Sequence, residues 1–157
     1  KMGNLVADAF YYITHFLNYQ VNFSLINGLG IRAGINKGVN SYGDIINILP
    51  NKKHLTILEV TGEHLQEALK SGLYPYISNF TNYTNSEYNT LSLKDNITIS
   101  KNEKYRLVTN SFLSIGKDNY TSLKNATVIE ENICSDIEAL ACFLKSDKFN
   151  IHNYLKN

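Results

Sequence analysis

The sequence predicts an α+β fold in which a mixed β-sheet is flanked by helices. Some segments repeat apolar residues with the 3.6-residue period of a helix, while others are short runs rich in β-branched and aromatic residues. These helical and strand segments do not follow the strict β-α-β order of a parallel α/β fold. The sheet is therefore expected to contain strands of both directions.

Size and composition are those of a folded domain. The chain has 157 residues, of which 43% are hydrophobic and 18% charged, and we predict one domain over residues 1–157. The net charge of +1 comes without a basic stripe, which gives no support to a nucleic-acid partner. The longest apolar stretch, 5–17, is interrupted by Asp8 and His15, so we expect no membrane span, which needs about 18 apolar residues.

The first third of the chain predicts a helix, a strand and a short helix. Residues 4–19 carry apolar side chains at helical spacing, and residues 21–26 are rich in β-formers. Ser41–Asp44 offers a cap and an acidic first turn for a short helix that runs to about Asn47. Pro50 then ends it.

The middle third predicts a second strand and helix followed by a loop. Residues 55–60 form an apolar run, and Thr61 precedes a helix that ends at Gly72. Its inward face consists of Leu65, Ala68 and Leu69. Residues 74–89 are rich in Asn, Thr, Ser and Tyr, which predicts an exposed loop.

The last part predicts four strands, of which the first two are separated by the turn-forming pair Asp95-Asn96. They are expected at 90–93, 97–99, 105–110 and 127–130. Residues 112–120 should form a glycine-containing loop between the last two of these strands.

Two helices are expected near the C-terminus, one capped by Ser135 and one at 151–155. Cys134 and Cys142 are eight residues apart in the first of these segments. A helix would separate them by about 12 Å, too far for a disulfide, so we interpret both as small buried apolar side chains. The four histidines are scattered, and no metal site is predicted in this chain.

The stretch Asn27-Gly28-Leu29-Gly30-Ile31-Arg32 follows the first predicted strand. Glycines at a strand end allow a tight turn and the close approach of a ligand. An arginine just beyond such a turn can bind a phosphate or carboxylate with two parallel hydrogen bonds. Ordinary strand-to-loop turns share this pattern, so the motif alone leaves both interpretations open.

Four stretches in order carry a resemblance to a known family. They are Gly3-Asn4-Leu5-Val6-Ala7-Asp8-Ala9, the Asn27–Arg32 stretch, Tyr42-Gly43-Asp44 continuing through Leu49-Pro50 to Leu58-Glu59-Val60-Thr61-Gly62, and residues 108–120. Together they resemble the C-terminal domain of the 5'-nucleotidase family, which includes UDP-sugar hydrolases and cyclic-nucleotide phosphodiesterases. The resemblance covers about residues 3–145 and implies that family's fold.

The resemblance also implies a nucleotide-binding role for particular residues. Arg32 would contact the phosphate, Asn27 would lie beside the base and ribose, Phe112 would stack on the base, and Asp118 would accept hydrogen bonds from the ribose hydroxyls. Gly28, Gly30 and Gly116 would be the loop glycines of this site. Phe112 as a core residue and Asp118 as the closure of its own turn are the structural alternatives.

In that family, two divalent metal ions on a separate N-terminal domain activate water for attack on phosphorus. The sequence has no Asp-x-His pair and no Gly-Asn-His-Glu run, so the isolated chain is expected to be catalytically inactive, with the N-terminal catalytic domain as its partner. The resemblance also implies an extracytoplasmic location, either secreted, on the cell surface or periplasmic.

Departures from the family pattern leave a second hypothesis open. Asn51 stands where the family has the second aromatic residue of its base clamp, while Leu29, Lys117 and Asn119 replace family glycines. The chain is therefore either the substrate-binding domain of a larger nucleotidase or a degenerate, non-catalytic relative that serves as a binding or structural module.

Overall fold

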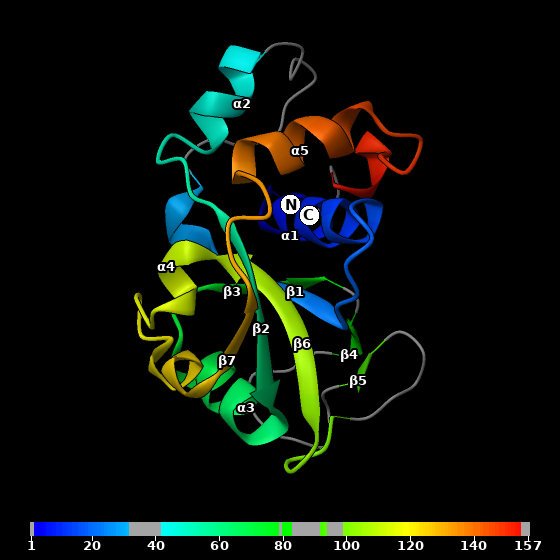
Figure 1. The fold of residues 1–157 in the computed structure, drawn as a ribbon. Helices are drawn as coiled ribbons and strands as arrows, with labels where there is room; N and C mark the ends of the chain where they lie inside the picture. Colours follow the sequence, from blue (N-terminus) through cyan, green and yellow to red (C-terminus); the bar gives the residue numbers. More distant parts are fainter. Residues whose placement is uncertain (1, 32–41, 79, 83–91, 94–98, 155–157) are drawn as a thin grey trace.

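The computed structural model describes residues 2–31, 42–78, 80–82, 92–93 and 99–154, drawn in colour in Figure 1. Its helices are α1 (Met2–Phe16), α2 (Tyr42–Ile48), α3 (Gly62–Ser71), α4 (Ser111–Ser114) and α5 (Asp136–Lys145). Its strands are β1 (Phe23–Asn27), β2 (Leu55–Thr61), β3 (Pro75–Ser78), β4 (Phe80–Asn82), β5 (Ser92–Leu93), β6 (Lys104–Asn110) and β7 (Thr127–Glu130). Short 3₁₀ turns cover Gly28–Gly30, Thr121–Asn125 and Ile151–Asn153.

Within these described ranges, five strands form one sheet in the order β3-β1-β6-β2-β7. Neighbours β1 and β6 are parallel, whereas β1–β3, β2–β6 and β2–β7 are antiparallel. A separate pair is formed by β4 and β5. The predicted mixed sheet flanked by helices is confirmed.

The sheet is buried on both faces because its central strands alternate between two apolar clusters. One cluster joins Ile26, Ile57 and Val108 to α1 and α5, and the other joins Leu25 and Leu58 to α3. Figure 1 shows α1 and α5 together on one side of the sheet and α3 on the other.

Capping residues begin two helices where the sequence predicts them. The Thr61 side chain accepts a hydrogen bond from His64 N at 3.2 Å at the start of α3. Ser135 and Glu138 form a reciprocal capping box at the start of α5. The strand predicted at 127–130 is also confirmed as β7.

The loop predicted over residues 74–89 is wrong in its first part. Residues 75–78 form β3, which pairs with β1, and residues 80–82 form β4. The Asn-, Ser- and Thr-rich sequence around them hid these short strands, and the position of β3 is set by its pairing with the distant strand β1.

Three further predictions of helices, strands and loops can be compared with the structure only in part. Ser41, the expected cap of the short helix, and residues 83–91 lie outside the described residues, as do residues 97–98 of one predicted strand. Ile99, the last residue of that strand, is buried but belongs to no strand. Within 112–120, the structure has one helical turn, α4, where only a loop was expected.

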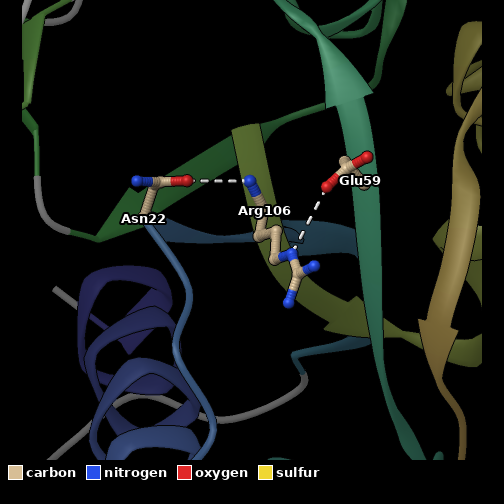
Figure 2. Close-up of polar contacts among 3 residues, drawn as sticks. All are labelled: Asn22, Glu59 and Arg106. Carbon is tan, nitrogen blue, oxygen red and sulfur yellow. Dashed lines mark hydrogen bonds and ion pairs between the residues drawn. The ribbon is translucent and has the colours of Figure 1, made fainter. Parts of the chain in front are cut away.

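The register of β2 and β6 is marked by a polar contact at the sheet surface (Figure 2). Arg106 lies opposite Glu59, and its Nε is 3.4 Å from Glu59 Oε2. Its backbone N also donates to Asn22 Oδ1 at 2.8 Å. Because both charged side chains are partly exposed, this ion pair fixes geometry more than it adds stability.

Both cysteines are free thiols, as the spacing predicted, but they are half-buried rather than fully buried. Burial and the neighbouring Glu138 raise the pKa of Cys134 to about 12. In the part of the chain that the structure describes, no helix has the length and apolar character to cross a bilayer.

Candidate functional site

Strand topology brings distant loops together at one end of the sheet, which we call the Asn27 end. Because β1 and β6 are parallel, they finish side by side at Asn27 and Asn110. β2 runs antiparallel to β6 and starts there, with Leu55 opposite Asn110. β3 also starts there, with Pro75 opposite Asn27. The loops that flank these strand ends share one end of the sheet for this reason.

A side-chain hydrogen bond joins two of these loops. Asn27 Nδ2 donates to Asp118 Oδ2 across 91 residues of sequence. Asn27 is only 4% exposed, whereas Asp118 is half-buried, and its Oδ1 has no hydrogen-bond partner among the described residues. The alternative in which Asp118 merely closes its own turn is wrong, because its carboxylate binds a different loop.

The backbone of residues 116–119 holds Asp118 in place through left-handed conformations. Gly116, Asp118 and Asn119 have φ values of 87°, 56° and 68°. Glycine adopts this region freely, and Asp and Asn tolerate it better than other residues. The Asp118 carbonyl also accepts a hydrogen bond from Leu73 N at 3.1 Å, so the loop is fixed from two sides.

Phe112 lies at the start of the same loop and faces solvent. Its backbone N and that of Leu113 both donate to Asn110 Oδ1 at 3.0 Å, which begins α4. The residue is 45% exposed, so the alternative in which it belongs to the core is wrong. Lys117 N donates to the Phe112 carbonyl at 3.2 Å, so Phe112 lies in the same turn as Asp118, the residue after Lys117.

Lys53, which sequence reasoning did not single out, places its ammonium over the Phe112 ring. Its Nζ lies 4.8 Å from the ring centroid, within the range of a cation–π contact. Its backbone is held by Asp136: Lys53 N donates to Asp136 Oδ1 at 3.2 Å, and Asp136 N donates to the Lys53 carbonyl at 2.8 Å.

Asp136 is buried, and burial raises its pKa above the value of 3.8 for an exposed carboxyl. Hydrogen bonds from Lys53 N and Ile137 N, together with the Lys53 charge, act in the opposite direction. Asp136, Lys53, Asn27 and Asn110 line a narrow pocket of about 10 Å³. That volume is at the limit for one water molecule, so a larger ligand would have to lie over the mouth of this pocket.

The loop glycines have different roles. Gly116 is required by its left-handed backbone. A Cβ on Gly28 would come within 2.9 Å of the Tyr76 ring, so the absence of a side chain there serves packing against β3. Gly28 N also donates to the Tyr74 carbonyl at 2.8 Å. Gly30 ends the 3₁₀ turn that follows β1.

The structure gives less information on Arg32 and Asn51, the remaining residues that the sequence analysis singled out. Arg32 lies outside the described residues, so its expected contact with phosphate stays a prediction. Asn51 is exposed in the loop before β2, at the Asn27 end of the sheet. The structure thus brings Asn27 and Asp118 into contact and places Phe112 in the same turn as Asp118.

No group of three or more His, Cys, Asp or Glu side chains able to hold a metal ion occurs within the described ranges. The side chains at the Asn27 end can stack on a flat ring, accept hydrogen bonds and place one positive charge.

Lys53 and Asp136 carry no local sequence signal of a site. Lys53 is one of two adjacent lysines, and Asp136 reads as an acid in the first turn of a helix. Proximity to Asn51, the departure from the family's aromatic clamp, was the single hint that this loop belongs to the site.

Comparisons with known proteins agree on one family. The sequence profile of "5'-nucleotidase, C-terminal domain" matches residues 1–125. The trifunctional nucleotide phosphoesterase protein YfkN of Bacillus subtilis (strain 168) is 30% identical over 146 residues, which cover 81% of this chain and 10% of YfkN. The cell wall protein Lmo0130 of Listeria monocytogenes serovar 1/2a is 26% identical over 171 residues, which cover 94% of this chain and 21% of that protein.

A solved structure has the same fold. The 5'-nucleotidase precursor from Thermus thermophilus superposes with a TM-score of 0.77 at 25% identity, covering 91% of this chain and 32% of that one. The chain therefore spans no more than 32% of the length of any of these three proteins.

Proposed function

Since this chain belongs to the 5'-nucleotidase family and matches its C-terminal domain, we propose that it binds the nucleoside part of a nucleotide substrate. The observation that carries this proposal is the contact between Asn27 and Asp118, in a loop that also carries the exposed side chain of Phe112. Loops from distant parts of the chain are needed to build this arrangement. Binding sites are commonly built from such loops on a rigid scaffold.

Each of these side chains suits one part of a nucleoside. The half-exposed Phe112 ring offers a stacking surface, and stacking of a base on an aromatic ring is worth roughly 1–3 kcal/mol. Asn27 holds Asp118 Oδ2, and Oδ1, which has no partner within the described ranges, would accept a hydrogen bond from a ribose hydroxyl. Arg32 would bind the phosphate, as the family resemblance implies.

Hydrolysis is proposed to belong to the larger enzyme. In that scheme the two divalent metal ions, which activate water, are held by an N-terminal domain. We assign to this chain the binding and orientation of the substrate, as the family resemblance implies. Incubated alone with AMP or UDP-glucose and a divalent metal, the chain should release no phosphate.

An extracytoplasmic location is proposed as well. Two similar proteins support it by their names, one a cell wall protein and the other a 5'-nucleotidase precursor.

The binding proposal is tested by an NMR titration of the chain with adenosine and inosine, following backbone amide shifts at the Asn27 end of the sheet. Phe112→Ala should weaken binding about fivefold or more, because it removes the stacking surface. Phe16→Ala is the matched control, since Phe16 is also an exposed phenylalanine (61%) but lies at the end of α1.

Two results would overturn the proposal. One is the absence of any shift at millimolar nucleoside. The other is a Phe112→Ala variant that binds as well as Phe16→Ala. Either outcome would favour the alternative, a degenerate relative that serves as an interaction module.

A further inference from the structure

A polar hollow lies at the end of the sheet where β1 and β6 begin, opposite to the site described above. Along β6, Val108 packs into the apolar cluster that includes α1. Arg106 and Lys104 precede it on the same face, because alternate residues of a strand share a face. Glu59 lies opposite Arg106 on β2. Toward this end, the face of the sheet that packs against α1 therefore changes from apolar to charged.

The hollow has a volume of about 500 Å³, within the range of roughly 300–1,000 Å³ that small-molecule sites occupy. Lys104, Arg106 and Glu59 line it together with His15, in the last turn of α1, and with residues 20–22, which connect α1 to β1. Three separate parts of the chain thus contribute polar side chains to one concave surface.

Arg106 is held from several sides in this hollow. Asn22 N donates to the Arg106 carbonyl and Arg106 N donates to Asn22 Oδ1, each at 2.8 Å. Glu59 Oε2 lies 3.4 Å from Arg106 Nε and orients the guanidinium. Figure 2 shows the two terminal nitrogens of the guanidinium directed away from Glu59, and the described residues provide no hydrogen-bond acceptor for them. The donor fork of Arg106 is therefore oriented in advance of any ligand.

The charges of the hollow favour a doubly negative group. A guanidinium fork matches two oxygens of a phosphate or carboxylate. Lys104 adds a second positive charge on the same strand face, against the single negative charge of Glu59. A phosphate monoester carries nearly two negative charges at neutral pH and can use both cations, whereas a carboxylate carries one.

We propose that this hollow binds the phosphate group of a small phosphate monoester, with Arg106 as the bidentate donor and Lys104 as the second positive charge. This site goes beyond the proposed function, because it lies at the other end of the sheet from the Asn27 end. An ester fits better than free phosphate, since the hollow has room for more than the phosphate group and the exposed Gln20 lines it as well.

The probe is glycerol 3-phosphate, titrated at neutral pH and constant ionic strength into the 157-residue chain while NMR follows the backbone amide shifts. Shifts should occur at residues 20–22 and 104–106 with an affinity on the order of 1 mM. Glycerol, which lacks the phosphate, should cause none of them. Inorganic phosphate should bind about threefold or more weakly, and equal or tighter binding of inorganic phosphate would overturn the assignment of an ester.

Variants separate recognition by the fork from a general effect of charge. Arg106→Gln should weaken binding about tenfold, and Arg106→Lys, which keeps the charge but not the fork, about fivefold. Lys70→Gln removes one positive charge from the last turn of α3, on the other side of the sheet, and should leave the affinity within about twofold. Circular dichroism checks that each variant is folded.

Three results would overturn the proposal. One is the absence of shifts at residues 104–106 with the probe at tens of millimolar. The second is an equal loss of affinity in Arg106→Gln and Lys70→Gln, and the third is full affinity in Arg106→Lys. Nucleoside binding at the Asn27 end should be unchanged in Arg106→Gln, so this site and the proposed function are tested independently.

Discussion

Replacing Asp118 should affect stability and binding to different degrees, depending on the side chain introduced. Asp118 has a left-handed backbone with φ of 56°, and its carboxylate is the acceptor for the buried amide of Asn27. Asparagine keeps the size, one acceptor oxygen and the tolerance for this conformation. Alanine keeps none of these.

The expected destabilisation follows from two physical effects. Alanine in a left-handed conformation costs roughly 1 kcal/mol more than aspartate. Leaving the amide of Asn27, which is 4% exposed, without its acceptor costs roughly 1–3 kcal/mol. Asp118→Ala should therefore lower the free energy of unfolding by about 2–4 kcal/mol, and Asp118→Asn by less than about 1 kcal/mol.

Binding should respond to both variants. Asp118→Asn replaces a charged acceptor of the ribose hydroxyls by a neutral one, which should weaken nucleoside affinity about fivefold. Urea unfolding followed by circular dichroism gives the stability, and calorimetry gives the affinity. Asp147→Ala, an exposed aspartate beyond α5, serves as the control and should change neither quantity.

The reasoning would be refuted by equal stability losses in Asp118→Ala and Asp118→Asn. That result would mean that the acceptor oxygen and the tolerance for the left-handed backbone, which asparagine keeps and alanine lacks, contribute nothing measurable to stability. Unchanged nucleoside affinity in Asp118→Asn would refute the role of the carboxylate in binding the ribose.

Three further outcomes are expected. Asn51→Phe should tighten adenosine binding by a factor of about 5 to 150, because it restores a second stacking surface. Calorimetry with Asn51→Ala as the control measures the two affinities, and equal affinity of the two variants would contradict the prediction. Burial raises the pKa of Asp136, so its ionised form disfavours folding at neutral pH, and this penalty disappears as pH falls through the folded pKa toward the unfolded one. Asp136→Asn should therefore be at least as stable as the parent at pH 7 and should lose that advantage toward about pH 4, as measured by thermal melts. A stability advantage of the variant that grows as the pH falls would contradict the prediction. A pKa of about 12 in place of 9.0 leaves Cys134 with about a thousandfold less thiolate at pH 8. Iodoacetamide should therefore alkylate Cys134 far more slowly than free cysteine, as followed by mass spectrometry. Equal alkylation rates would show that the Cys134 thiol is not desolvated.

Local features of the sequence determined much of the fold. Helix caps at Thr61 and Ser135 were readable because capping depends on residues three positions apart. The strands of the sheet interior were readable from their apolar runs. β3 was not, because its pairing with β1 is a contact with a distant segment and its four residues are too few to show a strand pattern.

The candidate site divides in the same way. The family resemblance was readable from short motifs, and these motifs also identified Asn27, Phe112 and Asp118 as candidate site residues. The contact of Asn27 with Asp118, the position of Lys53 over Phe112 and the burial of Asp136 became visible in the folded chain. The parallel pairing of β1 with β6 and the antiparallel pairing of β2 with β6 bring these residues to one end of the sheet, and strand pairing of this kind is set by packing across the whole domain rather than by any local run of residues.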